Sequence, residues 1–302
     1  MESIEKKKIL IAGGSGFIGK SLSHYLIQQG YSVSILSRSL KTLPDIQSYY
    51  WNPVSGKIDV DALIGKEVIM NLAGAGLADK FWTKKRKQEI IDSRIMSTDL
   101  LVKTIQQLDK KPSKFISASA IGFYGDRPGE ILSENSNNGD GFLAGLCKSW
   151  EDAAFKINFP EVQTTTVRIG VVVAENKGFA AQITKMAKAH INFIPGTGSQ
   201  MVSWIYIDDL CRIFEFLIEK SHSERIVNAV SPEPCSLGEL QKIIITKNRL
   251  KAFHISIPKF LMKFFLGSFS ELFLNDEAVL PEKLLRMNFE YQNPEPESIP
   301  II

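Results

Sequence analysis

A short apolar run followed by a glycine-rich turn lies close to the N-terminus of this chain. Residues 9–12 predict a buried parallel strand, and residues 17–29 predict a helix. The turn can be counted as Gly-x-Gly-x-x-Gly from Gly14 or as Gly-x-x-Gly-x-x-Gly from Gly13, and both counts end at Gly19. Because glycines lack a Cβ atom, backbone N–H groups can approach a pyrophosphate at the positive end of the helix. Such a corner also occurs without a ligand, but its place at the start of an alternating chain favours dinucleotide binding.

The segment after the next predicted strand, residues 31–36, indicates which dinucleotide is bound. In dinucleotide-binding folds the end of this strand meets the adenosine ribose. An acidic residue there binds the 2′-hydroxyl group of NAD, whereas an arginine accommodates the 2′-phosphate of NADP. This chain has Ser37 and Arg38 and no acid at this place, which favours NADP. The alternative is an arginine that is simply exposed in a loop.

Strand and helix patterns alternate over most of the chain. Further strands are predicted at 49–53, 68–74, 115–120, 167–173 and 226–230, and long helices at 83–108 and 142–157. This alternation predicts the α/β class, with a doubly wound parallel sheet of the Rossmann type. Ligands bind such sheets at the carboxyl ends of the strands, which makes Ser119 and Tyr124 candidate site residues.

Polar residues mark the starts of two helices. Thr83 is a good N-cap for the helix that follows it, and Asp208 or Asp209 is expected to cap a helix that runs through Glu219. The basic run at 84–87 could hold an anionic substrate, although such a run is more often a solvated face.

The C-terminal part of the chain has a different character. A helix is predicted at 178–189 and a loop at 195–200, and from Pro232 onwards helical and loop segments with several prolines suggest a smaller α+β lobe. An apolar cluster within 260–273 is expected to pack this lobe, although part of it could serve a partner.

Composition excludes several classes of protein. The 302 residues carry a net charge of only +3, which does not argue for nucleic-acid or membrane binding. The three cysteines are scattered, so neither a disulfide framework nor a metal site is indicated. No apolar run could span a bilayer, and the first eight residues lack the apolar core of a signal peptide. These features predict a soluble protein of a reducing compartment, the cytoplasm.

Several motifs together resemble one family. Gly-Gly-Ser-Gly-Phe-Ile-Gly at 13–19, Asn-Leu-Ala-Gly at 71–74 and Ser-x-Ser-Ala-x-Gly-x-Tyr-Gly at 117–125 are similar to extended short-chain dehydrogenase/reductases. Phe-Trp-Thr at 81–83 with Ser-Arg at 93–94, and further motifs as far as 280–289, narrow the resemblance to its atypical "epimerase family protein" subgroup. Members of this subgroup carry a C-terminal domain of unknown function. The resemblance covers essentially the whole chain.

The resemblance implies an NADP(H)-binding Rossmann domain and a substrate-binding lobe that closes over the nicotinamide. The first would comprise residues 1–174 and 201–233, and the second residues 175–200 and 234–302. Cofactor contacts are implied for Gly13, Gly14, Ser15, Gly16, Phe17, Ile18, Gly19, Ser37, Arg38, Leu72, Ala73, Gly74, Ser119, Cys147 and Arg168. Extended members often pair through the helices that correspond to 84–108 and 142–157, so a homodimer is one expectation.

The chain departs from the family at its usual catalytic residues. A short-chain enzyme commonly uses a tyrosine and, four residues later, a lysine that lowers the pKa of the phenol. Here these positions hold Leu143 and Cys147, and the usual serine position holds Ala120. Tyr124 is therefore the first candidate for proton donor, assisted by Ser119. Cys147 or Lys148 is a weaker candidate.

Two functions remain open from the sequence. The first is an oxidoreductase or epimerase for a small carbonyl or sugar-type substrate, in which Arg94 or Arg168 provides the positive charge that Tyr124 needs. The second is a protein that binds NADP(H) without turnover, as a redox sensor or by stabilising a partner. In that case Tyr124 packs against the cofactor, and Cys147 is a buried helical thiol.

Two further positions differ from the subgroup. Asn192 and Phe193 replace a glycine pair, and Phe193 would alter substrate choice if its loop lined the pocket. Tyr206 stands where the subgroup often has histidine, which removes one possible proton carrier.

Overall fold

The structure is a computed structural model that describes residues 7–40, 46–175 and 177–300. The expectation of no signal peptide rests on the first eight residues, of which residues 1–6 lie outside the described part of the chain. The chain forms two compact units, each assembled from several separate segments of the sequence. Unit 1 comprises Met1–Ser119, Ser149–Val167 and Phe214–Ile226, and unit 2 comprises Ala120–Lys148, Arg168–Ile213 and Val227–Ile302. The domain boundaries implied by the resemblance stay a prediction.

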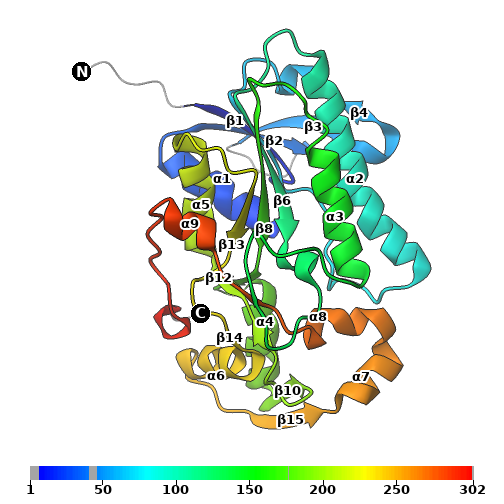
Figure 1. The fold of residues 1–302 in the computed structure, drawn as a ribbon, viewed down its shortest axis with the longest axis vertical. Helices are drawn as coiled ribbons and strands as arrows, with labels where there is room; N and C mark the ends of the chain where they lie inside the picture. Colours follow the sequence, from blue (N-terminus) through cyan, green and yellow to red (C-terminus); the bar gives the residue numbers. More distant parts are fainter. Residues whose placement is uncertain (1–6, 41–45, 176, 301–302) are drawn as a thin grey trace. The chain divides into compact units, whose positions relative to one another are not determined.

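An eight-stranded sheet, most of whose strands belong to unit 1, has the order β13-β8-β6-β5-β1-β2-β3-β4 (Figure 1). Its strands are β1 (Lys8–Ala12), β2 (Ser32–Ser37), β3 (Gln47–Asn52), β4 (Lys57–Ile58), β5 (Val68–Asn71), β6 (Lys114–Ala120), β8 (Gln163–Ile169) and β13 (Ile226–Ala229). Strand β1 pairs in parallel with both β2 and β5, so the strand order reverses beside it. Such a reversal is where doubly wound sheets bind their ligands. The predicted fold class is therefore confirmed.

Helices cover both faces of this sheet. Figure 1 shows α2 (Lys84–Gln107) and α3 (Phe142–Ala154) on one side, and α1 (Phe17–Gln28) and α5 (Ile207–Glu219) on the other. The core under α2 is formed by alternate residues of the strands and by one stripe of the helix, as the two periodicities require. Its members include Leu10, Ala12, Leu36, Ile69, Leu101, Val102, Ile105 and Phe115. Thr83 caps α2 as predicted, because its side chain accepts the N–H of Arg86.

Unit 2 is built from short strands and helices. The strands are β7 (Ile131–Leu132), β9 (Val171–Ala174), β10 (Ile191–Pro195), β11 (Met201–Val202), β12 (Trp204–Tyr206), β14 (Cys235–Ser236), β15 (Phe253–Ile257) and β16 (Ala278–Val279). The helices that lie wholly within it are α4 (Gly178–Lys188), α6 (Leu237–Lys247), α7 (Lys259–Leu266), α8 (Glu271–Leu274) and α9 (Glu282–Arg286). Its strands pair two by two: β10 with β15, β11 with β14, β12 with β9, and β16 with β7.

The prediction of one continuous strand over 167–173 was wrong. The chain forms β8 up to Ile169, and then β9, which leaves the large sheet and pairs with β12. The break falls at Gly170, where a Cβ atom would lie 2.5 Å from the backbone oxygen of Ser203. The close approach of a second backbone segment thus requires glycine at the point where the chain changes sheets.

The predicted capping role of the aspartates before Glu219 was also wrong. Helix α5 begins at Ile207, so Asp208 and Asp209 lie in its first turn rather than at its cap. The buried carboxylate of Asp209 accepts the backbone N–H groups of Gln292 and Asn293 at 2.8 and 2.7 Å, and Arg212 lies 3.0 Å from it. Asp209 therefore anchors the C-terminal segment of unit 2. None of the described helices has the length and apolar character to cross a bilayer.

Candidate functional site: a glycine turn in unit 1 and a buried tyrosine cluster in unit 2

Each glycine of the first turn meets a different constraint. Gly13 has a positive φ of 80°, and a Cβ atom there would lie 2.7 Å from the carbonyl carbon of Leu72. A Cβ atom on Gly14 would meet Ile35, and one on Gly19 would lie 2.2 Å from the backbone oxygen of Gly13. At Gly16 the nearest atom would be 3.3 Å away. Both ways of counting the motif thus describe one turn, which is packed against the end of β5.

The start of helix α1 suits an anion. Its N-cap is Gly16, so no side chain caps the helix, and no acidic residue lies in the first turn. The N-terminus of a helix carries a partial positive charge and N–H groups that point outwards. Ser15, Phe17 and Ile18, with the glycines, therefore form a backbone cradle that fits a pyrophosphate group.

Arg38 follows β2 directly and is exposed, whereas Ser37 before it is buried and accepts the N–H of Ser39. This is the edge of the sheet at which the glycine turn also lies, because β1 and β2 are parallel neighbours. Arg38 therefore lies at the same sheet edge as the glycine turn, and its contact with a cofactor stays a prediction.

The segment after β5 is held in place by Asn71, the last residue of that strand. The buried side chain of Asn71 donates to Thr98 Oγ1 at 2.8 Å and accepts the N–H of Ala73 at 3.2 Å. Leu72 donates its N–H to the oxygen of Ala12 at 2.9 Å, which ties the segment to β1. Ala73 is half-buried and Gly74 is exposed, so the backbone at this sheet edge remains accessible.

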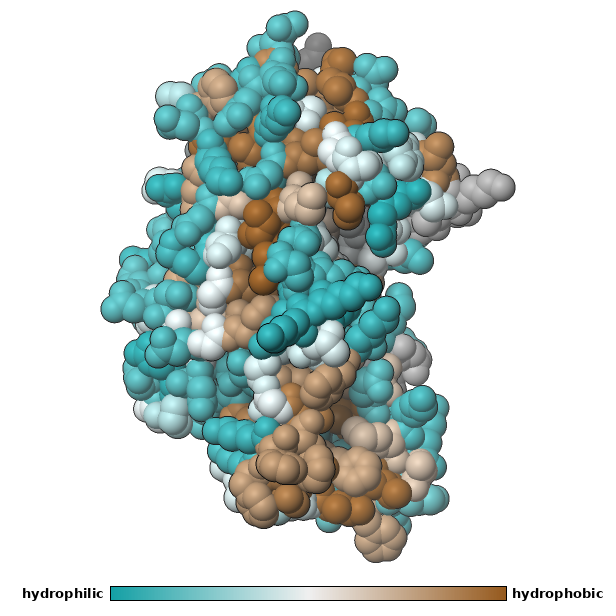
Figure 2. Space-filling view, turned by 90° about the vertical axis from the view of Figure 1, so that its right-hand side faces the viewer, coloured by the Kyte–Doolittle hydropathy of each residue, from teal (hydrophilic) through white to brown (hydrophobic). Residues whose placement is uncertain are grey.

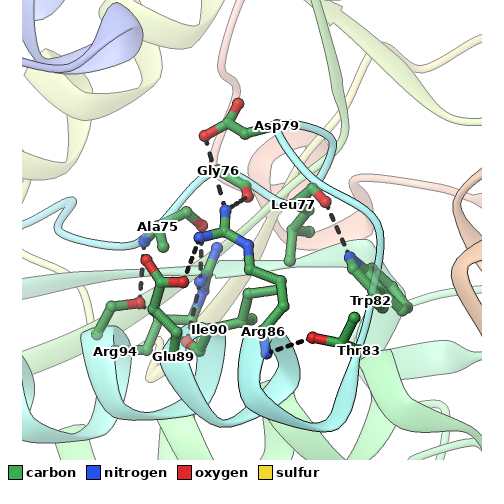
Figure 3. A network of polar contacts seen from close by, with 11 residues as sticks. Ala75, Gly76, Leu77, Asp79, Trp82, Thr83, Arg86, Glu89, Ile90 and Arg94 are labelled. Carbon is green, nitrogen blue, oxygen red and sulfur yellow. Dashed lines mark hydrogen bonds and ion pairs between the residues drawn. The ribbon is translucent and has the colours of Figure 1, made fainter.

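Residues in and just before helix α2 hold the rest of the segment after β5 in place (Figure 3). Arg94 donates to the oxygen of Ala75 at 3.1 Å, and its guanidinium stacks 5.0 Å from the ring centroid of Trp150. Trp82 donates its indole N–H to Leu77 at 2.9 Å. These contacts explain why the Phe-Trp-Thr and Ser-Arg motifs occur together: both hold one loop in place. Arg94 belongs to unit 1, and its charge is used there.

Arg86 is a site residue whose role was missed, because the basic run at 84–87 was interpreted as a solvated face. Its side chain is buried, donates to the oxygen of Gly76 at 2.5 Å and pairs with Glu89 at 2.8 Å (Figure 3). Spacing could have revealed it, because Arg86, Ile90 and Arg94 are separated by four residues each and share one helix face. The lysines at 84 and 85 are exposed.

Ser119 lies at the end of β6 and is buried. Its hydroxyl donates to the carboxylate of Glu151 at 2.7 Å, and Glu151 is itself buried in α3. Sequence reasoning gave Glu151 no role. The two side chains form a buried serine–carboxylate pair in unit 1.

In unit 2, Tyr124 is fully buried at the centre of a polar cluster. Its hydroxyl donates to Asn228 Oδ1 at 2.7 Å and accepts from Arg168 at 2.9 Å. The Arg168 guanidinium also lies 3.4 Å from the ring centroid of Phe123. Of the two cations considered from sequence, Arg168 is therefore the one beside the phenol. A buried arginine between two aromatic rings is held by both hydrogen bonding and cation–π attraction.

Burial raises the pKa of the Tyr124 phenol to about 12, although the charge of Arg168 and its hydrogen bond lower it in part. The phenol is thus a neutral hydrogen-bond donor near neutral pH. Protonated, it can give a proton to a group that becomes strongly basic, but it cannot act there as a base.

Glu134 is a second residue that sequence reasoning missed. It is buried, and its Oε1 atom accepts the N–H of Asn228 at 2.9 Å and that of Lys283 at 3.4 Å. Its Oε2 atom is buried without a hydrogen-bond partner. Burial raises the pKa of Glu134, and the two backbone N–H groups oppose that rise. A lone glutamate after a short strand gives no sequence signal for such a position.

Cys147 is buried in an apolar cluster of unit 2 with Tyr124, Leu132, Val230 and Val279. Apolar burial disfavours the thiolate form that a reactive cysteine needs. Lys148, by contrast, is exposed. The three cysteines are buried and form no disulfide with one another, and the described residues contain no group of three or more ligands placed to hold a metal ion.

The reversed strand order and the glycine turn at β1 define a Rossmann-type dinucleotide-binding fold. Residues 9–229 match the NAD dependent epimerase/dehydratase family, and residues 257–299 match a domain of unknown function (DUF1731). The chain belongs to the NAD dependent epimerase/dehydratase family. The family resemblance seen in the sequence is thereby confirmed.

Individual relatives extend over nearly the whole chain. The epimerase family protein YfhF of Bacillus subtilis is 30% identical over 94% of this chain and 93% of its own. The epimerase family protein ML0860 of Mycobacterium leprae is 29% identical over 97% of this chain and 94% of its own. A crystal structure of human epimerase family protein SDR39U1 with NADPH superposes with a TM-score of 0.85, at 25% identity, over 96% of this chain and 97% of that one.

Proposed function

We propose that this protein binds NADP(H) through unit 1 and acts as an epimerase-like oxidoreductase on a small carbonyl or sugar-type substrate. The observation that carries the cofactor assignment is the backbone cradle at Gly13–Gly19 beside an exposed Arg38, with no acid at the end of β2. The similar human protein, whose structure contains NADPH, supports the same assignment. The names of the relatives support the reaction class.

Different residues of unit 1 would bind different parts of the cofactor. The backbone of 13–19 would hold the pyrophosphate, and Arg38 would pair with the 2′-phosphate. The backbone at Leu72–Gly74 and at Ser119 would approach the rest of the dinucleotide. Bound NADP(H) would supply or accept a hydride. Arg86 and Arg94 are positioning residues here, because they hold the loop that follows β5.

Tyr124 would transfer the proton, because its hydroxyl group is a hydrogen-bond donor that lies beside the positive charge of Arg168. A pKa of about 12 makes it a donor to a developing alkoxide rather than a base. Glu134, joined to Tyr124 through Asn228, would tune this donor. Cys147, in its apolar cluster, is a weaker candidate than Tyr124 for any proton transfer.

The second candidate function is NADP(H) binding without turnover, as a redox sensor. The observation that favours it is the complete burial of Tyr124, whose hydroxyl is already engaged by two partners. A group in this state reaches no substrate unless unit 2 rearranges.

Calorimetric titration of the purified protein with NADPH and NADH tests the cofactor. We expect NADPH to bind more tightly, and Arg38→Ala to weaken NADPH by roughly 10- to 100-fold, the value of a lost charge-assisted hydrogen bond, while NADH is unchanged. Arg286→Ala, an exposed arginine of unit 2, is the matched control. If Arg38→Ala kept the full preference for NADPH, the assignment to NADP would lose its support.

A scan for NADPH oxidation against carbonyl and sugar-nucleotide panels then separates the two functions. Turnover that falls sharply in Tyr124→Phe would support the enzyme and the role of the phenol. Full turnover in that variant would remove Tyr124 from proton transfer. Tight NADPH binding with no turnover on any panel would favour the sensor.

A further inference from the structure

The two-stranded sheet β10–β15 exposes large apolar side chains on one of its faces. Ile191 pairs with Phe253, and Phe193 pairs with Ile255, so these four side chains share one face. All four are exposed, by between 36% and 79%. A sheet that covers a core normally turns its apolar face inwards and its polar face to water. Phe193 is thus part of an exposed strand, and the expectation of a loop at this position was wrong.

The opposite face of the same sheet carries Asn192, Ile194, His254 and Ser256, and it is covered only on the β10 side, because His254 and Ser256 are exposed. Asn192 is fully buried and donates to Gln241 of α6 at 3.0 Å. Its register partner is His254, whose ring nitrogen lies 3.1 Å from the same amide nitrogen. Unit 2 therefore buries the polar side chain of Asn192 and leaves the four large apolar side chains of the other face in contact with water. Exposed apolar groups in a cluster mark an interaction surface.

Helix α7, which follows β15, also exposes large apolar side chains. Phe260, Phe264 and Phe265 are exposed by 68% to 80%, whereas Met262 is buried. Phe260 and Phe264 are one turn apart, and Phe264 contacts Phe265 edge to face at 5.1 Å. Figure 2 faces the α7 side, and brown and tan residues gather at the bottom of that view, where Figure 1 places α7 and β15. The apolar cluster at 260–273 therefore packs unit 2 only in part.

The segments that carry this apolar surface are uniformly basic. Residues 240–270 contain six lysines and arginines and no acidic residue, and residues 177–207 contain three lysines and no acidic residue. Lys259 and Lys263 are exposed on α7 itself. The chain as a whole has a net charge of only +3, so this local excess is balanced by acids elsewhere. Composition alone, which gave no reason to expect membrane binding, could not reveal it.

We propose that this surface, formed by the exposed faces of β10–β15 and α7, docks on an anionic lipid bilayer. Exposed phenylalanines among lysines on a short amphipathic helix are the pattern of an interfacial segment, with apolar groups in the acyl boundary and cations among the headgroups. A second copy fits less well, because a symmetric contact would bring the two basic surfaces together. This association goes beyond the proposed reaction and requires no bound cofactor.

Co-sedimentation with vesicles tests the proposal on the full chain. We expect binding to vesicles of mixed phosphatidylcholine and phosphatidylglycerol, weaker binding at high salt, and little binding to phosphatidylcholine alone. The double variant Lys259→Gln, Lys263→Gln should bind the anionic vesicles roughly 25-fold more weakly, at about a fivefold loss per lysine. The triple variant Phe260→Ser, Phe264→Ser, Phe265→Ser should lose at least ~10-fold.

A matched control removes exposed apolar side chains elsewhere. The triple variant Val54→Ser, Ile64→Ser, Ile131→Ser should bind vesicles like the unmodified protein, because these three exposed residues lie outside the proposed surface. Absence of binding to anionic vesicles would overturn the proposal, as would equal binding by the phenylalanine variant. If light scattering showed a dimer that the phenylalanine variant converts to a monomer, with no vesicle binding, the surface would join two copies instead.

Discussion

The glycine turn of unit 1 is formed by backbone atoms, whereas the Tyr124 cluster of unit 2 is formed by buried side chains. The turn is made of backbone whose neighbours leave no room for Cβ atoms, and an exposed arginine follows the adjacent strand. The cluster is made of buried side chains that are hydrogen-bonded except at the Oε2 atom of Glu134, and burial raises the pKa values of Tyr124 and Glu134. The first is open to a ligand as it stands. The second is closed.

This difference separates binding from chemistry in physical terms. A backbone cradle carries no titratable group, so its affinity for a pyrophosphate should depend little on the protonation of the protein. Buried carboxyl and phenol groups instead couple stability to pH. Substitutions in the turn should therefore change cofactor affinity, and substitutions among the buried acids should change the pH dependence of unfolding.

The largest effect is expected at Gly19. In Gly19→Ala the Cβ atom would lie 2.2 Å from the oxygen of Gly13, so the turn must shift. We expect a loss of NADPH affinity of roughly 100-fold, equivalent to about 3 kcal/mol, measured by calorimetry together with thermal unfolding. Gly16→Ala, with its nearest contact at 3.3 Å, is the milder control. Unchanged affinity in Gly19→Ala would show that the turn does not carry the cofactor.

An effect of similar size, on stability rather than on cofactor affinity, is expected at Glu277 in unit 2. Burial raises the pKa of this carboxyl group from 4.5 to about 7, although a hydrogen bond from Asn275 opposes the rise. The folded state thus prefers the protonated form, and its stability falls as the pH rises from the unfolded to the folded pKa. Glu277→Gln should therefore stabilise the protein by about 3 kcal/mol near pH 8 and by almost nothing near pH 4.

Urea unfolding of the two proteins across this range measures the effect. Glu297→Gln, which removes an exposed carboxylate of the same unit, provides a comparison for the loss of a carboxylate. A constant difference between Glu277→Gln and the unmodified protein at all pH values would contradict the assignment.

The smallest effect is expected for Tyr124→Phe. Removing the hydroxyl leaves Asn228 and Arg168 without this partner, at a cost of about 2 kcal/mol near neutral pH. The pKa of Tyr124 is raised, so the unmodified protein loses stability above the unfolded pKa of about 10, by about 1.4 kcal/mol per pH unit, until the folded pKa is reached. The variant lacks this loss, and the gap should narrow there.

Denaturant unfolding near pH 8 and near pH 11 measures the gap, and other tyrosines cancel in the difference. NADPH affinity should stay as in the unmodified protein, in contrast to Gly19→Ala. A gap that does not depend on pH would mean that Tyr124 is not the buried donor described above.

Sequence reasoning succeeds where an outcome depends on near neighbours in the chain. The turn at 13–19, the helix behind it and the cap at Thr83 follow from local rules, and each is present. The single strand over 167–173 failed because Gly170 is required by Ser203, a residue of a distant segment. The cap at Asp209 failed for the same reason, because its partners lie at the end of the chain.

The site follows the same division. Arg38 and the glycines could be placed from sequence, since a strand end fixes them. Arg168 could be named but not placed, because 44 residues separate it from Tyr124 and only the tertiary fold brings them together. The role of Arg86 was missed because three neighbouring lysines carry the same charge, although they do not lie on the same face of the helix.

Neither unit is a continuous piece of chain, and this affects how the protein is made. Unit 1 lacks its last segment, Phe214–Ile226, until residue 226 has left the ribosome. At about 5 to 20 residues per second, its first 119 residues must therefore wait several seconds for the strands and helix that complete their sheet. During synthesis the nascent chain exposes apolar strand edges that the finished protein covers, so its yield in a cell should respond to chaperone supply more than that of a protein with contiguous domains.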